Sequence, residues 1–148
     1  MTSKLLILGQ EMAHLYSTCM APVLTATGLN RMELDVLLFL ANNPGLDTAS
    51  DMARLRGLSK SHISATVERL VQRELLARYV APQDRRTVHL SLMPGAAHAV
   101  TLGREAQAEF GRRLLEGISA DDQAALARVL AQMHRNTSAS PEKGMNVC

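Results

Sequence analysis

A short run of small polar and basic residues has the types needed to bind a nucleic acid. The run comprises Ser59, Lys60, Ser61, His62, Ser64, Ala65 and Arg69. Hydroxyl, ammonium and imidazole groups bind phosphate oxygens and base edges, and backbone N–H groups at the start of a helix favour an anion. Small side chains let such a helix lie deep in a groove. The alternative is that Ser59 only caps a helix and the others form an ordinary surface.

A second basic cluster, Asp84-Arg85-Arg86, lies between two strand-like runs and is expected at the tip of a hairpin. An arginine at such a tip can enter the minor groove of DNA, where the negative potential is strong. Asp84 has the wrong sign for a DNA contact. It is expected to hold a neighbouring arginine by a charge-assisted bond and so to support the hairpin's shape. The alternative is a solvated, charged β-turn.

Other chemistry is poorly supported by the sequence. The histidines His14, His62, His89, His98 and His134 are scattered, without an HExxH pair. There is no GxSxG motif around Ser59 and no phosphate-binding glycine loop. We therefore expect no enzyme activity, no cofactor and no metal site. The two cysteines form no CxxC pair, and Cys19 is expected to pack in a helix seam, although its spacing does not decide whether it is redox-active.

The charge is unevenly distributed along the chain. Between Arg54 and His89 there are eight basic and three acidic residues, whereas the whole chain has 16 and 14. The centre is therefore basic and the flanks acidic, which indicates a polyanionic partner for the centre only. An ordinary solvated face would account for the charge equally well. No segment is long and apolar enough to span a bilayer and no signal peptide is evident, so we expect a cytoplasmic protein without a membrane partner.

The first half of the sequence predicts three helices. Apolar residues between Leu5 and Leu24 repeat every three or four positions, with a kink or break expected at Pro22. Asn30 and Glu33 form a capping box for a second helix, which ends at residues 42–45. Leu46-Asp47 is a candidate for a very short strand.

Thr48 and Asp51 form the next capping box, and Gly57 ends that third helix. Its Met52, Ala53 and Leu55 are expected to face inward. Ser59 caps a fourth helix over residues 60–74, so that two helices meet across a tight turn. Such a turn is typical of a helix-turn-helix.

Two strands, residues 76–80 and 87–92, are expected to form the hairpin. A long helix over residues 95–116 follows, and Ser119 with Asp122 caps a last helix. The fold class is therefore mainly α with a small β-hairpin, a winged helix-turn-helix with flanking helices. We expect a DNA-binding domain at 28–95, a helical dimerisation region at 1–27 and 96–135, and a disordered tail at 136–148. The outer helices leave apolar seams that a second copy of the chain would cover.

The sequence also resembles the MarR family of transcriptional regulators, from about residue 22 to residue 133. The likeness is carried by Leu46-x-Thr48-x-x-Asp51-x-Ala53, Gly57-Leu58-Ser59-Lys60-Ser61-x-Ile63-Ser64, Leu70-Val71-x-x-x-Leu75-Leu76 and Pro82-x-Asp84-Arg85-Arg86-x-Val88-x-Leu90-x-Leu92. Two positions depart from the family pattern. Met93-Pro94 replaces a usual helix cap, and Arg56 replaces an apolar residue whose packing Leu55 is expected to take over.

The resemblance implies a homodimer that binds double-stranded DNA at pseudo-palindromic operators, usually as a repressor, with release by a small-molecule effector or oxidant. It implies that Arg86 enters the minor groove and that Asp84 supports it. The operator, the target genes, the effector and its residues are not specified by the sequence, nor is repression over activation. The alternative is a winged helix that binds proteins rather than DNA, and a steep salt dependence of DNA binding would separate the two.

Overall fold

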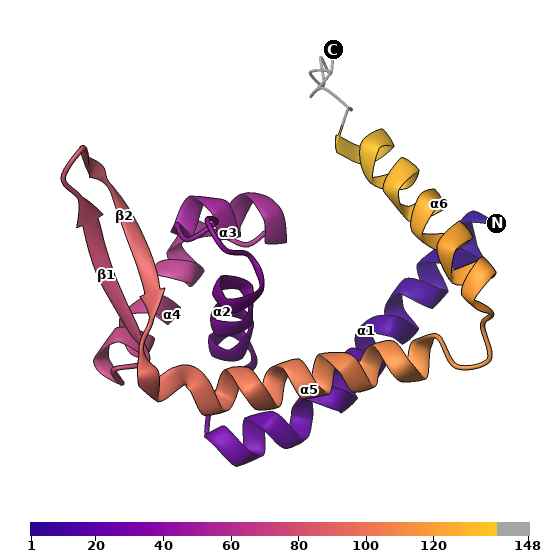
Figure 1. The fold of residues 1–148 in the computed structure, drawn as a ribbon, viewed down its shortest axis with the longest axis horizontal. Coiled ribbons are helices and arrows are strands. Elements are labelled where there is room, and N and C mark those ends of the chain that lie inside the picture. The colour runs from indigo at the N-terminus through magenta and orange to yellow at the C-terminus, as the bar shows by residue number, and fades with distance from the viewer. Residues whose placement is uncertain (139–148) are drawn as a thin grey trace, which may run out of the picture. The chain divides into compact units, whose positions relative to one another are not determined.

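The computed structural model describes residues 1–138 and contains six α-helices, one short 3-10 helix and one antiparallel hairpin within that range (Figure 1). The elements are α1 (Thr2–Thr27), α2 (Arg31–Asn42), α3 (Ala49–Arg56), α4 (Lys60–Gln72), β1 (Leu76–Ala81), β2 (Asp84–Leu92), η1 (Pro94–Ala96), α5 (Ala97–Leu114) and α6 (Ala120–Ser138). The chain divides into two compact units, residues 1–111 and the segment from residue 112. The expected class, mainly helical with a two-stranded wing, is confirmed.

Helix α1 is longer than expected and is not broken at Pro22. It runs through the proline to Thr27 and ends at Gly28, which adopts the left-handed conformation (φ 68°). Proline removes one backbone hydrogen bond from a helix interior. The neighbouring Met20 and Val23 are buried in the core, and their packing keeps the segment helical across that gap.

The two predicted capping boxes are both present. In α2, the Asn30 side chain accepts a bond from the Glu33 N–H, and the Glu33 carboxylate accepts one from the Asn30 N–H. Thr48 and Asp51 form the same reciprocal pair at the start of α3. Each box satisfies N–H groups that have no partner within the helix. The start of each helix is therefore fixed by residues only three positions apart.

The turn between α3 and α4 also follows the prediction. Gly57 has φ 62°, a left-handed conformation that glycine adopts without steric cost, and Ser59 caps α4 by accepting a bond from the His62 N–H. Helix α4 ends at Gln72, two residues earlier than expected. Glu74 takes the left-handed conformation (φ 58°), and the Leu75 N–H bonds to the Leu70 carbonyl. These features close a helix end of the kind usually marked by glycine.

The hairpin is longer than predicted and its turn lies elsewhere. Strands β1 and β2 pair from Leu76–Leu92 to Val80–Val88, then the register shifts and Ala81 pairs with Asp84. The tip is therefore the Pro82-Gln83 turn, and proline suits the second position of a turn because its φ is fixed near the required value. Residues 84–86, expected at the tip, form the first three residues of β2.

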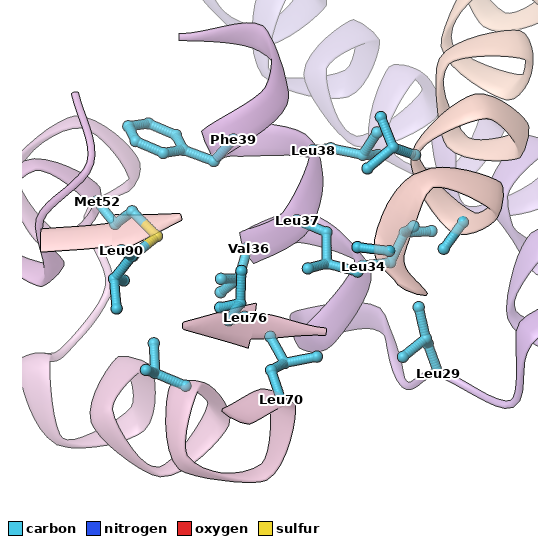
Figure 2. Packing of buried hydrophobic residues seen from close by; sticks show 14 of the residues in the cluster. Leu29, Leu34, Val36, Leu37, Leu38, Phe39, Met52, Leu70, Leu76 and Leu90 are labelled. Atoms are coloured by element: carbon cyan, nitrogen blue, oxygen red, sulfur yellow. The ribbon is translucent and has the colours of Figure 1, made fainter. Parts of the chain in front are cut away.

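The core of residues 1–111 is built around α2, whose Leu34, Val36, Leu37, Leu38 and Phe39 are all buried. Figure 2 shows Val36 and Leu37 of α2, Leu70 of α4 and Leu76 of β1 pointing into a shared interior. Helix α3 contributes Met52, which is 1% exposed. Leu55 was expected to face inward and to take over the packing of the apolar residue that Arg56 replaces, and this prediction is wrong.

Leu55 is 48% exposed. The Arg56 guanidinium lies 3.9 Å from the Asp35 carboxylate, so its position serves an ion pair on α2 rather than apolar packing. The segment Leu46-Asp47 does not form a strand. Its Leu46 N–H bonds to the Asn43 carbonyl, and its Asp47 carbonyl accepts the Leu90 N–H of β2.

The first of the C-terminal elements, η1, begins without a side-chain cap. Met93 precedes η1 and makes no capping hydrogen bond, in line with the altered sequence there, and α5 follows directly. Ser119 caps α6 by accepting a bond from the Asp122 N–H, as predicted. Helix α6 reaches Ser138, so residues 136–138 of the expected tail are helical, and residues 139–148 lie outside the described range. Among residues 1–138, no helix combines the length and hydropathy needed to cross a bilayer.

Candidate nucleic-acid interface

The N-terminal half of α4 presents a face of small and polar side chains. The predicted residues Ser59, Lys60, Ser61, His62, Ser64 and Ala65 are all exposed, while Ile63, Thr66, Val67 and Leu70 on the opposite side are buried. The split follows the helical period, so packing of the apolar side decides which side faces outward. A face of hydroxyls and a methyl group allows close approach of a flat or grooved partner.

Ser59 has a structural role in this face. Its hydroxyl accepts the His62 N–H at 3.3 Å and lies 3.3 Å from the Ser61 hydroxyl. The next N–H groups of the first turn point along the helix axis toward solvent, where the helix dipole favours an anion. Lys60 and Ser61 lie in that turn and extend the same positive end.

Arg69, also predicted to contact DNA, is held within the protein on one side. Its Nε donates to the Glu33 carboxylate at 3.2 Å and its Nη2 donates to the Thr66 hydroxyl at 3.2 Å. Arg73 reaches the other oxygen of the same carboxylate at 3.4 Å. Glu33 is 5% exposed, and two arginines together with the Asn30 N–H compensate its burial.

This arrangement shows a role for Glu33 that sequence reasoning missed. The sequence identified Glu33 only as the partner of Asn30 in a capping box, because a local pattern relates residues only three positions apart. In the structure the carboxylate joins α2 to the C-terminal half of α4. The Arg69 side chain remains 47% exposed, so its guanidinium is oriented by Glu33 while part of it faces solvent.

The start of β2 is shaped by Asp84. Its Oδ1 accepts the Arg86 backbone N–H at 2.9 Å, and its Oδ2 accepts the Thr87 hydroxyl at 2.6 Å. Both bonds lower the pKa of Asp84 from its usual value, and the bond from Thr87 has the larger effect. The expected charge-assisted bond to an arginine side chain is replaced by the bond to the Arg86 backbone. The Arg85 and Arg86 side chains are exposed.

Helix α4 and the hairpin meet across a shallow hollow of about 230 Å³. Its lining residues come from α3, α4 and both strands: Ala49, Ser64, Val67, Arg78, Val88 and Leu90. Beside it the Arg78 guanidinium donates to the Glu68 carboxylate at 2.7 Å. The hollow brings Ser64 of the polar α4 face against the strand that carries Arg85 and Arg86 at its start. The polar face of α4 therefore adjoins the hairpin at Val88 and Leu90, and the exposed Arg85 and Arg86 lie further along β2 toward the turn.

A second group that sequence reasoning missed joins the hairpin to the loop before α3. The Asp47 carboxylate accepts the Tyr79 hydroxyl at 2.8 Å and contacts His89 Nδ1 at 2.7 Å. Tyr79 and His89 come from opposite strands and Asp47 lies 42 residues before His89, so no local pattern connects the three.

Other candidate chemistry gains no support from the geometry. Within residues 1–138, no three His, Cys, Asp or Glu side chains gather closely enough to hold a metal ion. His98 and Glu105 are exposed on α5. Cys19 is half-buried in α1 and makes no disulfide.

Comparison with known proteins gives a consistent result. A MarR family model matches residues 27–87. A protein of Thauera aromatica assigned as a transcriptional regulatory protein for the hcr operon is 26% identical over 119 residues, covering 80% of this chain and 71% of the relative. The family-model match spans the helix-turn-helix, β1 and the first part of β2, up to Thr87.

Solved structures agree in fold. A transcriptional regulator of known crystal structure superimposes with a TM-score of 0.80 at 24% identity, covering 90% of this chain and 97% of the other. The repressor CouR, solved on a 23-mer DNA duplex, gives 0.71 at 26% identity, with 91% and 92% covered. BpsR of Bordetella bronchiseptica gives 0.68 at 20% identity, with 88% and 98% covered. By the sequence of residues 27–87 and by its fold, this chain is similar to the MarR family of winged helix-turn-helix transcriptional regulators.

Proposed function

We propose that the protein is a homodimeric, DNA-binding transcriptional regulator, acting as a repressor that a small effector releases from its operator. The observation that carries the proposal is that the small polar face of α4 adjoins the hairpin at one hollow, while the same hairpin carries the exposed Arg85 and Arg86 near its turn. CouR, at 26% identity, was solved bound to a DNA duplex, which supports the same use of this fold. DNA binding by BpsR is regulated by 6-hydroxynicotinic acid, which supports effector control.

In this proposal α4 enters the major groove. Lys60, Ser61 and His62 at its exposed first turn contact phosphates and base edges, and Ser64 and Ala65 allow close approach. Arg86 enters the adjacent minor groove, with Arg85 beside it and with Asp84 fixing the backbone that carries both. Arg69, oriented by Glu33, reaches a phosphate at the edge of the groove. The domain at 28–95 thus supplies the DNA contacts.

The helices outside that domain supply the dimer. Leu5, Leu6, Ile7 and Leu8 are exposed on α1, and Leu126, Val129, Leu130 and Met133 are exposed on α6. No residue of α6 is buried, although its apolar residues repeat with helical spacing. A helix with such a stripe gains stability only when another surface covers the stripe, and a second copy of the chain provides that surface. We assign residues 1–27 and 96–135 to dimerisation.

An effector bound between α1, α2 and α5 would require a change in the hollow now present there. The small hollow beside Tyr16, Asn42 and Gln107 has about 50 Å³, whereas ligand pockets commonly have about 300–1,000 Å³. An effector therefore either opens this region or binds where a second subunit completes the pocket. Opening there would move α2 relative to α5, because the Gln107 amide donates to the Tyr16 hydroxyl and Asn42 bonds Gln107. Consistent with a regulator, we place the protein in the cytoplasm and assign it no catalytic reaction.

The proposal is tested by the salt dependence of binding to a duplex that the wild-type protein selects from a random-sequence pool. Release of counterions from phosphates gives a steep fall of affinity with salt. A flat response, or no binding at low salt, would favour the alternative winged helix that binds proteins.

Arg86→Ala tests the wing directly. Loss of a minor-groove arginine is expected to weaken binding by about 1–3 kcal/mol and leave the dimer intact. Arg128→Ala is the matched control, because it removes the same charge from α6 on the side away from Leu126 and Leu130. Equal affinities for the wild type and Arg86→Ala would reject the wing's role.

A further inference from the structure

Three hydrogen bonds from the hairpin converge on one residue outside it. The Asp47 carbonyl accepts the Leu90 N–H at 2.8 Å. Its carboxylate takes the Tyr79 hydroxyl on Oδ2 at 2.8 Å and His89 Nδ1 on Oδ1 at 2.7 Å. Asp47 lies in the loop between α2 and α3, so these bonds are the hairpin's attachment to the start of the helix-turn-helix.

The side-chain contacts hold both strands at the same level. Tyr79 and His89 are directly paired across the hairpin, and their rings stack with centroids 5.1 Å apart and planes at 21°. Asp47 therefore bonds a cross-strand pair rather than a single strand. A contact to one strand leaves the hairpin free to twist about it, whereas bonds to two paired side chains oppose both twisting and bending.

The electrostatic environment agrees with an ionised, tightly held Asp47. The bond from His89 is the largest cause that lowers the pKa of Asp47, and the bond from Tyr79 acts in the same direction. The hydrogen bond between the Tyr79 hydroxyl and Asp47 raises the pKa of Tyr79. The carboxylate is thus the charged acceptor of both bonds, and bonds to a charged acceptor are the stronger kind.

The attachment lies close to the wing's basic residues. Arg86 is three residues before His89 on the same strand, a separation of roughly 10 Å at the usual strand rise. A change of hairpin direction at residues 79 and 89 is therefore carried directly to Arg85 and Arg86. Asp47 also directly precedes Thr48, the N-cap of α3. The hairpin is therefore bonded to the start of the helix-turn-helix that contains α4.

We propose that Asp47, Tyr79 and His89 form a wing anchor, a set of positioning residues that fixes the direction of the hairpin and so delivers Arg85 and Arg86 to DNA. The expected effect of the anchor on DNA affinity rests on the proposed function. Its effect on the direction of the hairpin does not. None of the three residues needs to touch DNA. Their effect on affinity passes through the wing arginines.

A double-mutant cycle tests that dependence. Using the duplex selected by the wild type, affinities are measured for Asp47→Ala, Arg86→Ala and the double variant. Asp47→Ala is expected to weaken binding by about fivefold or more in the wild-type background and by less than about twofold when Arg86 is already absent. Equal losses in the two backgrounds, or no loss in the first, would overturn the proposal.

Charge provides a second criterion. Removing a carboxylate from a DNA-binding protein by itself strengthens attraction to phosphates, so a loss of affinity in Asp47→Ala runs against the charge change. Glu74→Gln is the matched control, because it removes one exposed negative charge at the junction of α4 and β1. Glu74→Gln is expected to bind as well as the wild type or better. If Asp47→Ala binds as Glu74→Gln does, the anchor has no positioning role.

Amide hydrogen exchange separates failure of the anchor from failure of the proposed function. Asp47→Ala is expected to speed exchange in residues 77–91 while α4 remains protected, whereas Glu74→Gln leaves both unchanged. Unchanged exchange in the hairpin would overturn the anchor whether or not the wild type binds DNA. If the Ala variant does not fold, Tyr79→Phe, which keeps the ring stacking and loses one bond, is measured by the same cycle with a smaller expected loss.

Discussion

At the scale of single residues, carboxylates near the interface act mainly on the protein rather than on its partner. Asp84 binds the backbone and hydroxyl of the residues that follow it, and Glu33 holds two arginines from beneath α4. A negative group next to a polyanion opposes binding unless it orders a cation or a loop. The contacts of these two carboxylates show such ordering, which gives them a use in a basic surface.

Asp84→Asn gives a prediction at this scale. The amide oxygen can still accept the Arg86 N–H, but the amide NH2 group can only donate to the Thr87 hydroxyl, and the negative charge that strengthens both bonds is lost. We expect weaker DNA binding although one negative charge has been removed, together with faster amide exchange at residues 84–87. Affinity measured by fluorescence anisotropy checks the first effect. Tighter binding, following the charge alone, would show that Asp84 does not support the wing.

At the scale of elements, α2 and α5 approach one another closely because Gly103 has no side chain. A Cβ added there would lie 2.7 Å from Leu38 Cδ2 and 3.1 Å from Leu38 Cγ. Leu38 is 2% exposed and surrounded by the core, so it has little room to move. The glycine is therefore retained inside a helix, where it is normally unfavourable, because it permits this packing.

Gly103→Ala is accordingly expected to destabilise the protein. Overpacking in a core commonly costs about 1–3 kcal/mol, and the gain in helix propensity from glycine to alanine is about 1 kcal/mol. We expect a net loss of up to about 2 kcal/mol in the free energy of unfolding, measured by urea denaturation. Gly111→Ala in the same helix is the control, because a Cβ there meets nothing within 4 Å. That variant should be more stable than the wild type, and a stabilised Gly103→Ala would show that Leu38 can yield.

At the scale of the whole molecule, DNA binding and dimerisation should be coupled. Two linked domains bind neighbouring half-sites far more tightly than one, because the second contact is made at a high effective concentration. The apolar residues that α6 leaves exposed are the part of this chain best suited to form that link. Disrupting them should therefore weaken DNA binding without altering any DNA contact.

Leu130→Glu tests this coupling. A charge placed within the apolar stripe of α6 is expected to shift the protein toward monomer in sedimentation experiments and to lower operator affinity by at least about tenfold. Ala131→Glu adds the same charge on the opposite side of α6 from Val129 and Met133 and should remain dimeric. A Leu130→Glu protein that is still a dimer would place the interface elsewhere. A monomeric variant that binds the operator with wild-type affinity would contradict the coupling between dimerisation and DNA binding.

The sequence by itself determined the helices, their caps and the type of fold. Asn30 with Glu33, Thr48 with Asp51 and Ser59 with the turn at Gly57 are signals that act over a few residues, and the structure forms each of them. The period of apolar residues likewise predicted the exposed face of α4, since one side of that helix must be buried. These features need no knowledge of distant contacts.

Only the tertiary structure decided how the elements are joined. Arg69 meets Glu33 across 36 residues and His89 meets Asp47 across 42, separations at which a sequence pattern specifies no partner. Helix α4 ends earlier than predicted because Glu74, not a glycine, takes the left-handed conformation, and the turn that follows is joined to a distant segment by the Met93 N–H bond to the Leu75 carbonyl. The residue types offered DNA-binding chemistry, and the long-range contacts fixed α4 against α2 and the hairpin against the loop before α3.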